Sequence, residues 1–490
     1  MLKDRKLRFD YTLGGNCYGY CRIEGYSGDL WGPVRDKNII KEIDTEDYYL
    51  AEVKTSDTDS DYHTFSIDYY FNGLFLNFNL NEIDTVKYFG VDLKDRLFPK
   101  EELIDFVETV LNEYGLVKKN DEHDVDIVSG CLKITLPNRV LDDKMITICK
   151  SIAKSIRNYY SYKGVHITRM FGSYVLLMNV DRKLKAVMAT PIPIKYCPLM
   201  IKLLKEVGGE TANKLIDSLS ISDEENQTKL MCELINEVVI GTGYFDTNRP
   251  LNSCEANVLF GASETISSAF KNDMLDAAVI VSNNLGTIIT TNDENTQGAV
   301  KRMTGLFYTS PSKTLVDEAY NVGIIPVFPF TAEIDQLEGV REAIRLGYKR
   351  IAVTLAAQDN DLLDKLKELE SDGVTIYKFG LCSTGIKRKT ALSMKNNADI
   401  IWSCASKYVS ELIEPNAIAQ VGIKIPVHIM TKKGWELVKN HLEVMSETNI
   451  DDVELRKGDN KPVFLHSNDE IKKLVRRDIK KCNDCPHPCI

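Results

Sequence analysis

Hydrophobic and polar positions follow two periods in the second half of the chain. Between residues 275 and 442, apolar runs of strand length alternate with stretches of helical spacing, and small polar residues follow each run. This alternation is typical of βαβ units. We therefore predict an α/β fold with a mainly parallel, Rossmann-like sheet in the C-terminal half, with strands at residues 276–281, 324–328, 350–354, 375–380, 399–402 and 425–430. Its helices are expected at residues 313–321, 336–346, 361–370, 386–396, 407–414 and 434–445.

The first part of the chain has a different pattern. It is rich in Asp, Tyr and Phe, and residues 64–78 alternate on both sides of Asn72-Gly73, which is a strong signal for a hairpin turn. We predict a smaller β-rich or α+β region before the α/β part. The expected division is a β-rich domain at residues 1–120, an α+β segment at 121–193, an α/β domain at 194–445, and a basic helix with a cysteine-rich tail at 446–490.

Composition narrows the class of protein. A content of 43% apolar and 27% charged residues is ordinary for a soluble globular protein. The net charge of -10 disfavours nucleic acid as the main partner. No apolar run reaches the roughly 20 residues of a membrane span, and no apolar signal core follows Met1, so we expect no membrane partner and a cytoplasmic location.

Small polar residues at the predicted strand ends are candidates for ligand binding. Helix N-termini and turns present free N–H groups to anions. Two cations, Lys387 and Arg388, stand in a predicted first helical turn, where they oppose the helix dipole and an anionic ligand would explain them. The alternative is that these residues only cap helices and form turns. The other candidate residues are Asn283, Asn284, Gly286, Thr287, Ser383, Thr384, Gly385 and Ser406.

Two further residues at these ends suggest thiol chemistry. Cys404 stands between a predicted strand and a helix start, where the helix N-terminus and the nearby Lys407 are expected to lower its pKa. A thiolate there would serve as a nucleophile or a metal ligand. Cys382 has the same place one βα unit earlier, so the two thiols are expected to approach each other. The alternative is that both cysteines are small residues that fill a turn.

The twelve cysteines include a cluster at the C-terminus. Without a signal peptide, metal or thiol roles are favoured over disulfides. Cys482, Cys485, His487 and Cys489 fall within eight residues, which predicts an iron–sulfur cluster or a zinc site. An unmetallated tail is the alternative.

Eight short strings in the second half occur together in a familiar order. They cover residues 196–199, 260–264, 276–281, 286–290, 332–340, 347–354, 404–408 and 420–427. In this respect the chain resembles the methanogenesis marker protein 8 family over roughly residues 180–445. The resemblance implies a methanogenesis-linked role in an anaerobe, in maturation, activation or cofactor handling of methyl-coenzyme M reductase, with that enzyme or related maturation factors as partners. It implies no reaction.

Three hypotheses remain open at this point. The chain binds a small anionic ligand or a metal or iron–sulfur centre at the strand ends and assists a partner enzyme. Alternatively, it is a cysteine-dependent enzyme in which Lys407 assists Cys404 in attacking a small anionic substrate. The third hypothesis is a non-catalytic interaction scaffold. Whether the chain is an enzyme is thus undecided by its sequence.

Overall fold

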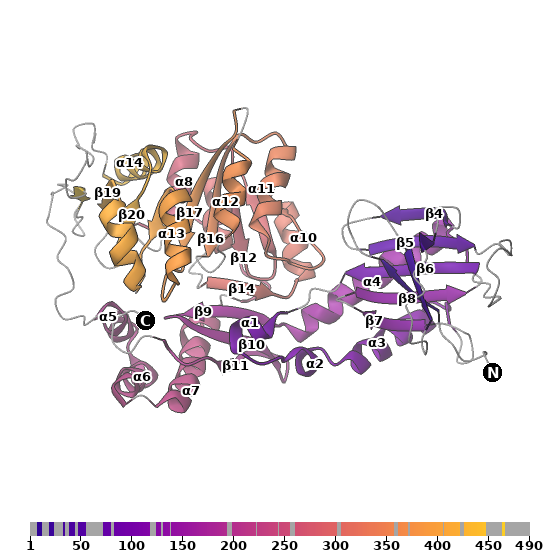
Figure 1. The fold of residues 1–490 in the computed structure, drawn as a ribbon. Helices are drawn as coiled ribbons and strands as arrows, with labels where there is room; N and C mark the ends of the chain where they lie inside the picture. The colour runs from indigo at the N-terminus through magenta and orange to yellow at the C-terminus, as the bar shows by residue number, and fades with distance from the viewer. Residues whose placement is uncertain are drawn as a thin grey trace. The chain divides into compact units, whose positions relative to one another are not determined.

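The structure is a computed structural model of the 490-residue chain. It describes residues 7–11, 19–23, 33–34, 39–44, 48–54, 72–79, 83–117, 124–128, 131–137, 139–193, 198–221, 223–243, 245–254, 260–300, 305–356, 361–370, 373–404, 406–421, 426–446 and 463–465. The chain forms two compact units, one of residues 1–82 and 98–156, the other of residues 83–97 and 157–490 (Figure 1).

An antiparallel sheet is the centre of the first unit. Its strand order is β4-β5-β6-β8-β7. A second, three-stranded sheet has the order β1-β2-β3. The strands are β1 (Leu7–Tyr11), β2 (Gly19–Ile23), β3 (Pro33–Val34), β4 (Ile39–Asp44), β5 (Tyr48–Lys54), β6 (Asn72–Asn79), β7 (Asp124–Val128) and β8 (Cys131–Pro137), and the helices α3 (Lys100–Glu113) and α4 (Asp143–Lys163) follow β6 and β8.

The expected hairpin turn at Asn72-Gly73 is wrong. Both residues lie inside β6, where Asn72 pairs with Lys54 and Gly73 pairs with Val53 and Pro137. Pairing on both sides places these residues inside the sheet, where Leu74 and Leu76 are fully buried. Tertiary pairing has overridden the local turn preference here.

The second unit contains a nine-stranded sheet that is parallel in its centre and again at its edge, where β21 pairs with β19. Strands β12, β16, β17 and β18 run parallel to one another, whereas β15, β13, β20 and β19 join by antiparallel pairs. The fold is therefore mixed α/β, and the sheet is not mainly parallel. In spatial order the strands are β15 (Ile325–Pro326), β13 (Gly286–Thr290), β12 (Ala277–Ser282), β16 (Arg350–Ala356), β17 (Thr375–Leu381), β18 (Ile400–Trp402), β20 (Val427–Ile429), β19 (Ala419–Val421) and β21 (Val463–Leu465).

Helices cover both faces of this sheet. Alternate residues of β12 enter two different cores, with Ala278 and Ile280 in one and Ala277 and Val279 in the other. This follows from the two-residue period of a strand. The first core is packed by α8 (Ala262–Lys271), α9 (Asp293–Val300), α10 (Lys313–Asn321) and α14 (Lys432–Ser446), and the second by α11 (Gln336–Arg345), α12 (Leu362–Glu368), α13 (Arg388–Asn397) and the π-helix η3 (Val409–Ile413).

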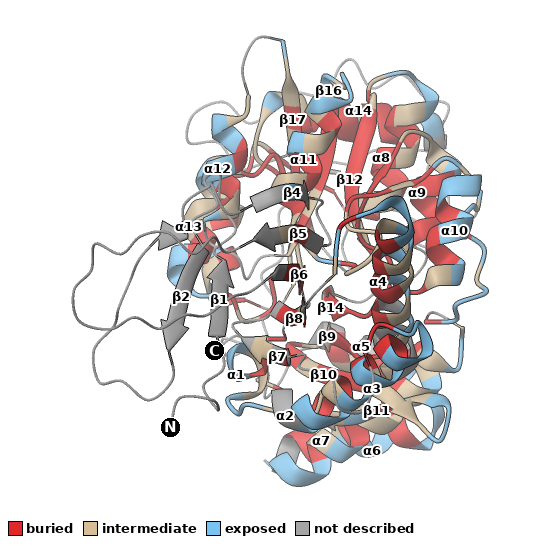
Figure 2. Cartoon of the chain, turned by 90° about the vertical axis from the view of Figure 1, so that its right-hand side faces the viewer, coloured by how far each residue is buried: buried red, intermediate tan, exposed pale blue. Residues whose placement is uncertain are grey.

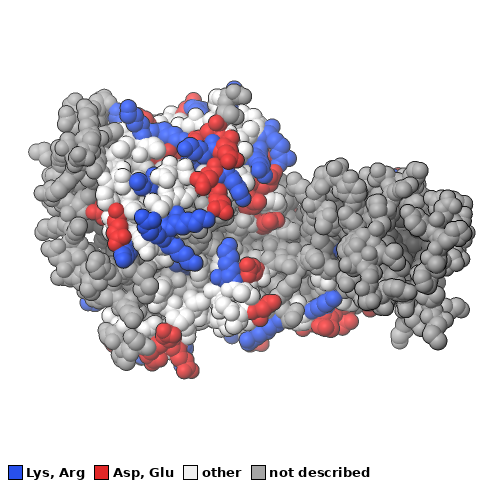
Figure 3. All heavy atoms as spheres, viewed as in Figure 1, with Lys and Arg blue, Asp and Glu red and all other residues white. Residues whose placement is uncertain are grey.

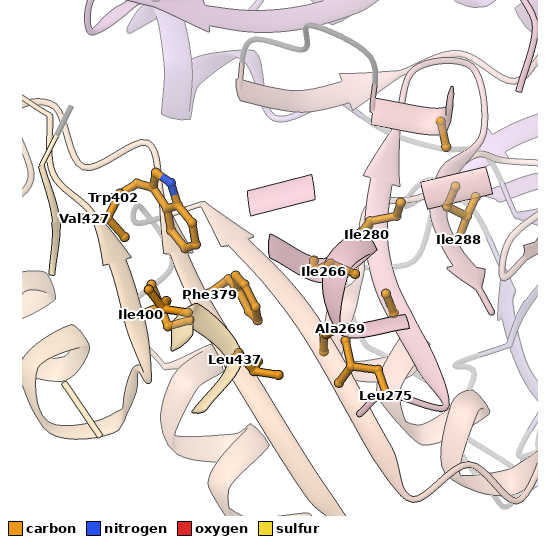
Figure 4. Packing of buried hydrophobic residues seen from close by; sticks show 14 of the residues in the cluster. Ile266, Ala269, Leu275, Ile280, Ile288, Phe379, Ile400, Trp402, Val427 and Leu437 are labelled. Carbon is orange, nitrogen blue, oxygen red and sulfur yellow. The ribbon is translucent and has the colours of Figure 1, made fainter. Parts of the chain in front are cut away.

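The first of these cores contains a stacked aromatic pair. The rings of Phe379 and Trp402 lie 5.5 Å apart at an interplanar angle of 16°. Figure 4 shows Ile400 and Leu437 beside Phe379, and Ile266 and Ala269 nearer to Leu275 and Ile280. The Trp402 Nε1–H donates to the carbonyl of Phe260 at 2.7 Å, so its polar atom is satisfied.

A smaller sheet of the second unit brings distant segments together. Strand β14 (Gly305–Thr309) pairs with β9 (His166–Met170), and the order continues through β10 (Ser173–Val180) to β11 (Lys183–Ala189). Helices α5 (Pro198–Val207), α6 (Gly209–Ile221) and α7 (Glu224–Ile235) pack against this sheet (Figure 1). The π-helix η2 (Asn236–Ile240) continues α7. The short helices α1 (Thr85–Phe89) and α2 (Lys94–Leu97) also belong to the second unit.

Burial follows the amphipathic pattern of the helices. Figure 2 shows α9 and α10 with buried residues on one side and exposed residues on the other.

Of the helices in the described ranges, none combines the length and apolar character that a membrane crossing requires.

Candidate functional site

The predicted ligand residues lie at one edge of the large sheet. Because β12, β17 and β18 are parallel, the residues that follow them meet at the carboxyl edge. Asn283 and Asn284 follow β12, Ser383 and Thr384 follow β17, and Cys404 follows β18. The polar residues among them are buried, with Ser383 at 0% exposure and Asn283 at 2%.

The carboxyl end of β12 is a three-residue turn into β13. Asn284 and Gly286 adopt left-handed φ angles of 65° and 67°. A Cβ at Gly286 would lie 2.2 Å from the carbonyl oxygen of Ala332, so only glycine fits there. Thr287 donates its N–H to the Glu333 carbonyl at 2.9 Å, and its hydroxyl accepts the Asp335 N–H at 2.8 Å. Gly286 and Thr287 therefore hold the turn against the neighbouring loop.

Asn284 is fixed from three sides. Its N–H donates to the Thr309 hydroxyl at 2.7 Å, its carbonyl accepts the Ser312 N–H at 3.0 Å, and its Nδ2 donates to the Ser310 carbonyl at 3.3 Å. Behind Thr309, His166 Nδ1 shares a 2.8 Å hydrogen bond with the same hydroxyl. Burial lowers the pKa of His166 to about 3, so its imidazole is neutral at ordinary pH.

A partly buried arginine, Arg249, lies on this turn, and no sequence pattern predicts it. Arg249 Nη2 donates to Ser282 Oγ at 2.8 Å and to the carbonyl and Oδ1 of Asn283, both at 3.0 Å. These oxygens are all neutral, and no described carboxylate is within ion-pair distance. Burial lowers the pKa of Arg249 to about 10, with Asp246 acting in the opposite direction. The guanidinium thus stays charged at neutral pH.

Two buried polar atoms at this turn have no hydrogen-bond partner. They are Nε of Arg249 and Oδ1 of Asn284. Buried polar atoms in folded proteins are nearly always paired, and each exception calls for an explanation. The first is a donor on a cation and the second is an acceptor on a neutral amide.

A second arginine holds the turn that follows β17. Arg169, on β9, donates to the carbonyls of Gly172 at 3.3 Å, Cys382 at 3.2 Å and Thr384 at 2.8 Å. Cys382 has a left-handed φ of 53°, which is costly for a residue with a side chain. Two bonds from one side chain therefore hold the strained turn, and the third links it to the turn at Gly172.

Cys404 lies beside this turn, but its electrostatics differ from the prediction. Its N–H donates to Ser383 Oγ at 2.7 Å. Burial raises the pKa of the Cys404 thiol, against the Thr384 and Ser383 hydroxyls and the charge of Arg169, which lower it. Burial raises the pKa of Cys382 to about 12, and Cys404 adds to that rise. The two cysteines therefore interact, as expected, but the expected lowering of the Cys404 pKa is wrong because desolvation outweighs the groups that favour a thiolate.

Lys407 and the basic turn lie on the surface. Lys407 Nζ is 3.8 Å from Glu411 and 5.8 Å from the centre of the Tyr408 ring, so its contacts among the described residues are with these two and not with Cys404. Lys387 is the N-cap of α13 and Arg388 its first residue, and both are exposed. Figure 3 shows Lys and Arg side chains gathered over α13. Gly385 has a φ of 66° in the turn before this helix.

Ser406 is buried, and so are two polar residues of the neighbouring strands. Ser406 Oγ, Gln420 Oε1 and His428 Nδ1 all lack a hydrogen-bond partner within the described part of the chain. Gln420 and His428 pair across β19 and β20, so they share one face of the sheet. Burial lowers the pKa of His428 to about 4.

Strand β14 links the two ends of the site. Gly305, at its start, lies so close to Cys382 that an added Cβ would be 2.9 Å from Sγ. Thr309, at its end, bonds Asn284. The five residues of β14 thus run from the end of β17 to the end of β12.

No metal site is formed by the residues in the described ranges. They contain no group of three or more His, Cys, Asp or Glu side chains placed to hold a metal ion. The predicted metal ligands Cys482, Cys485, His487 and Cys489 lie outside the described residues.

Comparison with known proteins identifies the part of the chain that carries this site. Residues 166–443 match a family described as uncharacterized proteins conserved in archaea (DUF2099). The chain belongs to this family. An uncharacterized protein of Methanocaldococcus jannaschii is 33% identical over 275 residues, which cover 56% of this chain and 89% of that protein. No solved structure matches the chain.

The family match includes every element of the site. It begins at His166 on β9 and ends within α14, so it contains both arginines, Asn284 and both cysteines. Residues 1–165, which hold the first unit's sheets, precede it. The site is therefore formed by the DUF2099 part of the chain alone.

Proposed function

We propose that this chain binds a small anionic ligand at the carboxyl edge of its large sheet, at the turn that follows β12. The observation that carries the proposal is Arg249, a cation buried among neutral oxygens with its Nε unpaired. Burying a charge without a counterion is costly, and proteins normally pair such a group. An anion at Arg249 would supply the missing charge and the missing acceptor.

The other end of the edge supports the same charge preference. Arg169 also donates only to neutral oxygens, the carbonyls of Cys382 and Thr384 in the strained turn and that of Gly172. The hydroxyls of Ser383 and Thr384 stand beside it. Two guanidinium groups without carboxylate partners at one sheet edge favour anions over cations there.

The biological setting is a separate proposal, and it rests on the resemblance to the methanogenesis marker protein 8 family. We propose that ligand binding assists maturation, activation or cofactor handling of a partner such as methyl-coenzyme M reductase. What supports this is the order of the eight strings along residues 196–427. An iron–sulfur cluster or zinc ion at the cysteine tail remains part of this proposal.

The test of anion binding is thermal stabilisation by sulfate, hydrogen phosphate and simple carboxylates. A ligand that binds only the folded chain at 100 times its Kd adds about 2.7 kcal/mol. Arg249→Met should abolish the stabilisation. The matched control is Arg341→Met, because Arg341 is an exposed arginine whose partner is Glu338. Equal anion stabilisation in both variants would refute the proposal.

A cysteine-dependent enzyme is the second candidate function. The observation in its favour is that hydroxyls of Thr384 and Ser383 and the charge of Arg169 all lower the pKa of Cys404. Burial works against it, so this candidate requires the ligand itself to change the surroundings of the thiol. A Cys404→Ser variant that binds anions normally and still supports any turnover detected in the wild type would exclude it.

A further inference from the structure

The unpaired atoms at the β12 turn define the ligand more closely than its charge. Resting on the proposed anion site, we propose that the ligand is a small hydroxy acid, an organic acid that carries a hydroxyl group besides its carboxylate. The carboxylate would accept from Arg249 Nε, and the hydroxyl would donate to Asn284 Oδ1. Both protein atoms are buried and have no partner.

The orientation of the Asn284 amide is fixed by its surroundings. Its Nδ2 donates to the Ser310 carbonyl, so a reversed amide would place two acceptor oxygens against each other. The N–H and C=O of the residue are also paired, and the residue is 5% exposed. Oδ1 is thus a preorganised acceptor, and an anion alone cannot satisfy it because a carboxylate has no proton to donate.

The donor must be neutral. An ammonium group, as in an amino acid, would place a second positive charge close to Arg249, whose own charge Asp246 favours without outweighing the effect of burial. A hydroxyl donates without that repulsion. Arg249 is only partly buried as a residue, although its Nε is buried.

The conformation at Asn284 offers two matched variants. Its φ of 65° suits Asn, Gly and Asp, so neither Asn284→Gly nor Asn284→Asp strains the turn. Both lose the bond to Ser310, so they differ mainly in charge. Asn284→Gly removes the acceptor, while Asn284→Asp places a carboxylate where it can neutralise Arg249.

The experiment compares lactate with propionate by titration calorimetry on the full chain, with alanine and sulfate as further probes. The wild type should bind lactate about three- to tenfold more tightly than propionate, the worth of one neutral hydrogen bond. Asn284→Gly should bind both equally, and Asn284→Asp should bind neither. Alanine should bind more weakly than lactate.

The outcomes separate this inference from the anion site. Equal binding of lactate and propionate by the wild type, with both lost in Arg249→Met, would overturn the hydroxy acid and leave the anion site standing, with a water molecule pairing Asn284. Anion binding unchanged in Arg249→Met would overturn both. A preference for lactate that persists in Asn284→Gly would also overturn the inference.

Discussion

The two edges of the large sheet differ in the partners of their cationic side chains. At the amino edge, Lys378 and Lys433 lie among the carboxylates of Glu370 and Asp399, with Lys378 Nζ 2.8 Å from Glu370. At the carboxyl edge, Arg169 and Arg249 donate only to neutral oxygens. The same sheet therefore pairs these lysines with carboxylates at its amino edge, whereas the two arginines at its carboxyl edge have no carboxylate hydrogen-bond partner among the described residues.

A second ion network strengthens the comparison. Arg350 Nε donates to Asp276 at 3.0 Å at the start of β12 and β16, and Arg350 Nη2 is 3.1 Å from Asp273. Arg350, Lys378 and Lys433 at this edge thus each have a carboxylate partner. Since both edges belong to one fold, a general tolerance for buried charge does not explain why Arg169 and Arg249 lack carboxylate partners.

The largest expected effect is at the amino edge. Lys378→Met leaves Asp399, which is 1% exposed, with one cation fewer, and breaking a buried ion pair costs about 3–5 kcal/mol. Denaturant unfolding measures this loss. Binding of anions at the carboxyl edge should survive wherever the variant remains folded. A loss below about 1 kcal/mol would remove the distinction between the two edges.

Acid should destabilise the protein through its buried neutral histidines. The pKa of His166 is about 3 and that of His428 about 4, both lowered by burial from an ordinary value near 6.5. Below pH 6.5 the unfolded chain binds protons that the folded chain does not, so stability is complete above that pH and falls toward pH 4. At pH 5 each histidine costs about 2 kcal/mol.

His428→Gln isolates one of these contributions. Unfolding free energies of the variant and wild type should converge as the pH falls from 7 to 5, by about 2 kcal/mol. Carboxylates elsewhere titrate in both proteins and cancel in the difference. Parallel curves would show that His428 is protonated in the folded state.

Replacing Arg249, which has no carboxylate partner, should lower the free energy of unfolding less than replacing Lys378, which has carboxylate partners. Arg249→Met loses three bonds to neutral oxygens but also releases a desolvated charge. The free energy of unfolding without added anions should change by less than about 2 kcal/mol. A loss as large as that of Lys378→Met would mean that Arg249 is a structural residue.

Thiol reactivity tests the carboxyl edge by rate. Cys382 has a pKa of about 12 and burial also raises the pKa of Cys404; the hydrogen bond to Glu294 raises the pKa of Cys254 too, but Cys254 is exposed. Iodoacetamide labelling at pH 7, followed by peptide mass spectrometry, should therefore modify Cys254 before either buried thiol, because the thiolate is the reacting form. Faster labelling of Cys404 would favour the enzyme hypothesis.

The smallest effect is expected at Lys407. Its partner Glu411 is 3.8 Å away, and both side chains are close to half exposed. Such surface pairs contribute about 0.5 kcal/mol or less. Lys407→Gln should leave both stability and anion binding within error, and a larger loss of binding would restore this residue to the site.

The central part of the fold was predictable because its signals are local. The apolar runs at 276–281, 350–354 and 375–380 correspond to β12, β16 and β17, and the helix predicted at 313–321 coincides with α10. Strand β13 was missed because Gly286 and Thr287 resemble a loop. The antiparallel pairs of β18, β20 and β19 depend on contacts that no run of residues displays.

The site was half predictable for the same reason. Asn283, Asn284, Ser383 and Cys404 follow apolar runs, so their shared edge could be inferred from parallel strands. The positions of Arg169 and Arg249 at the site could not be predicted, because an arginine in a strand or a loop is usually exposed and no nearby residue indicates that it is buried. The one weak signal was the absence of a neighbouring acidic residue at positions 166–174 around Arg169.

The hydrogen bonds of Arg169 to the turn after β17 affect the order in which the chain can fold. The bonds from Arg169 to Cys382 and Thr384 span 213 and 215 residues of chain. During synthesis β9 can pair with β10 at once, but it must wait for β14 and then for the end of β17 before its arginine is satisfied. Contacts between such distant residues form late. The strained turn at Cys382 is thus completed late, so errors at that stage of folding would leave a compact chain that is unable to bind its ligand.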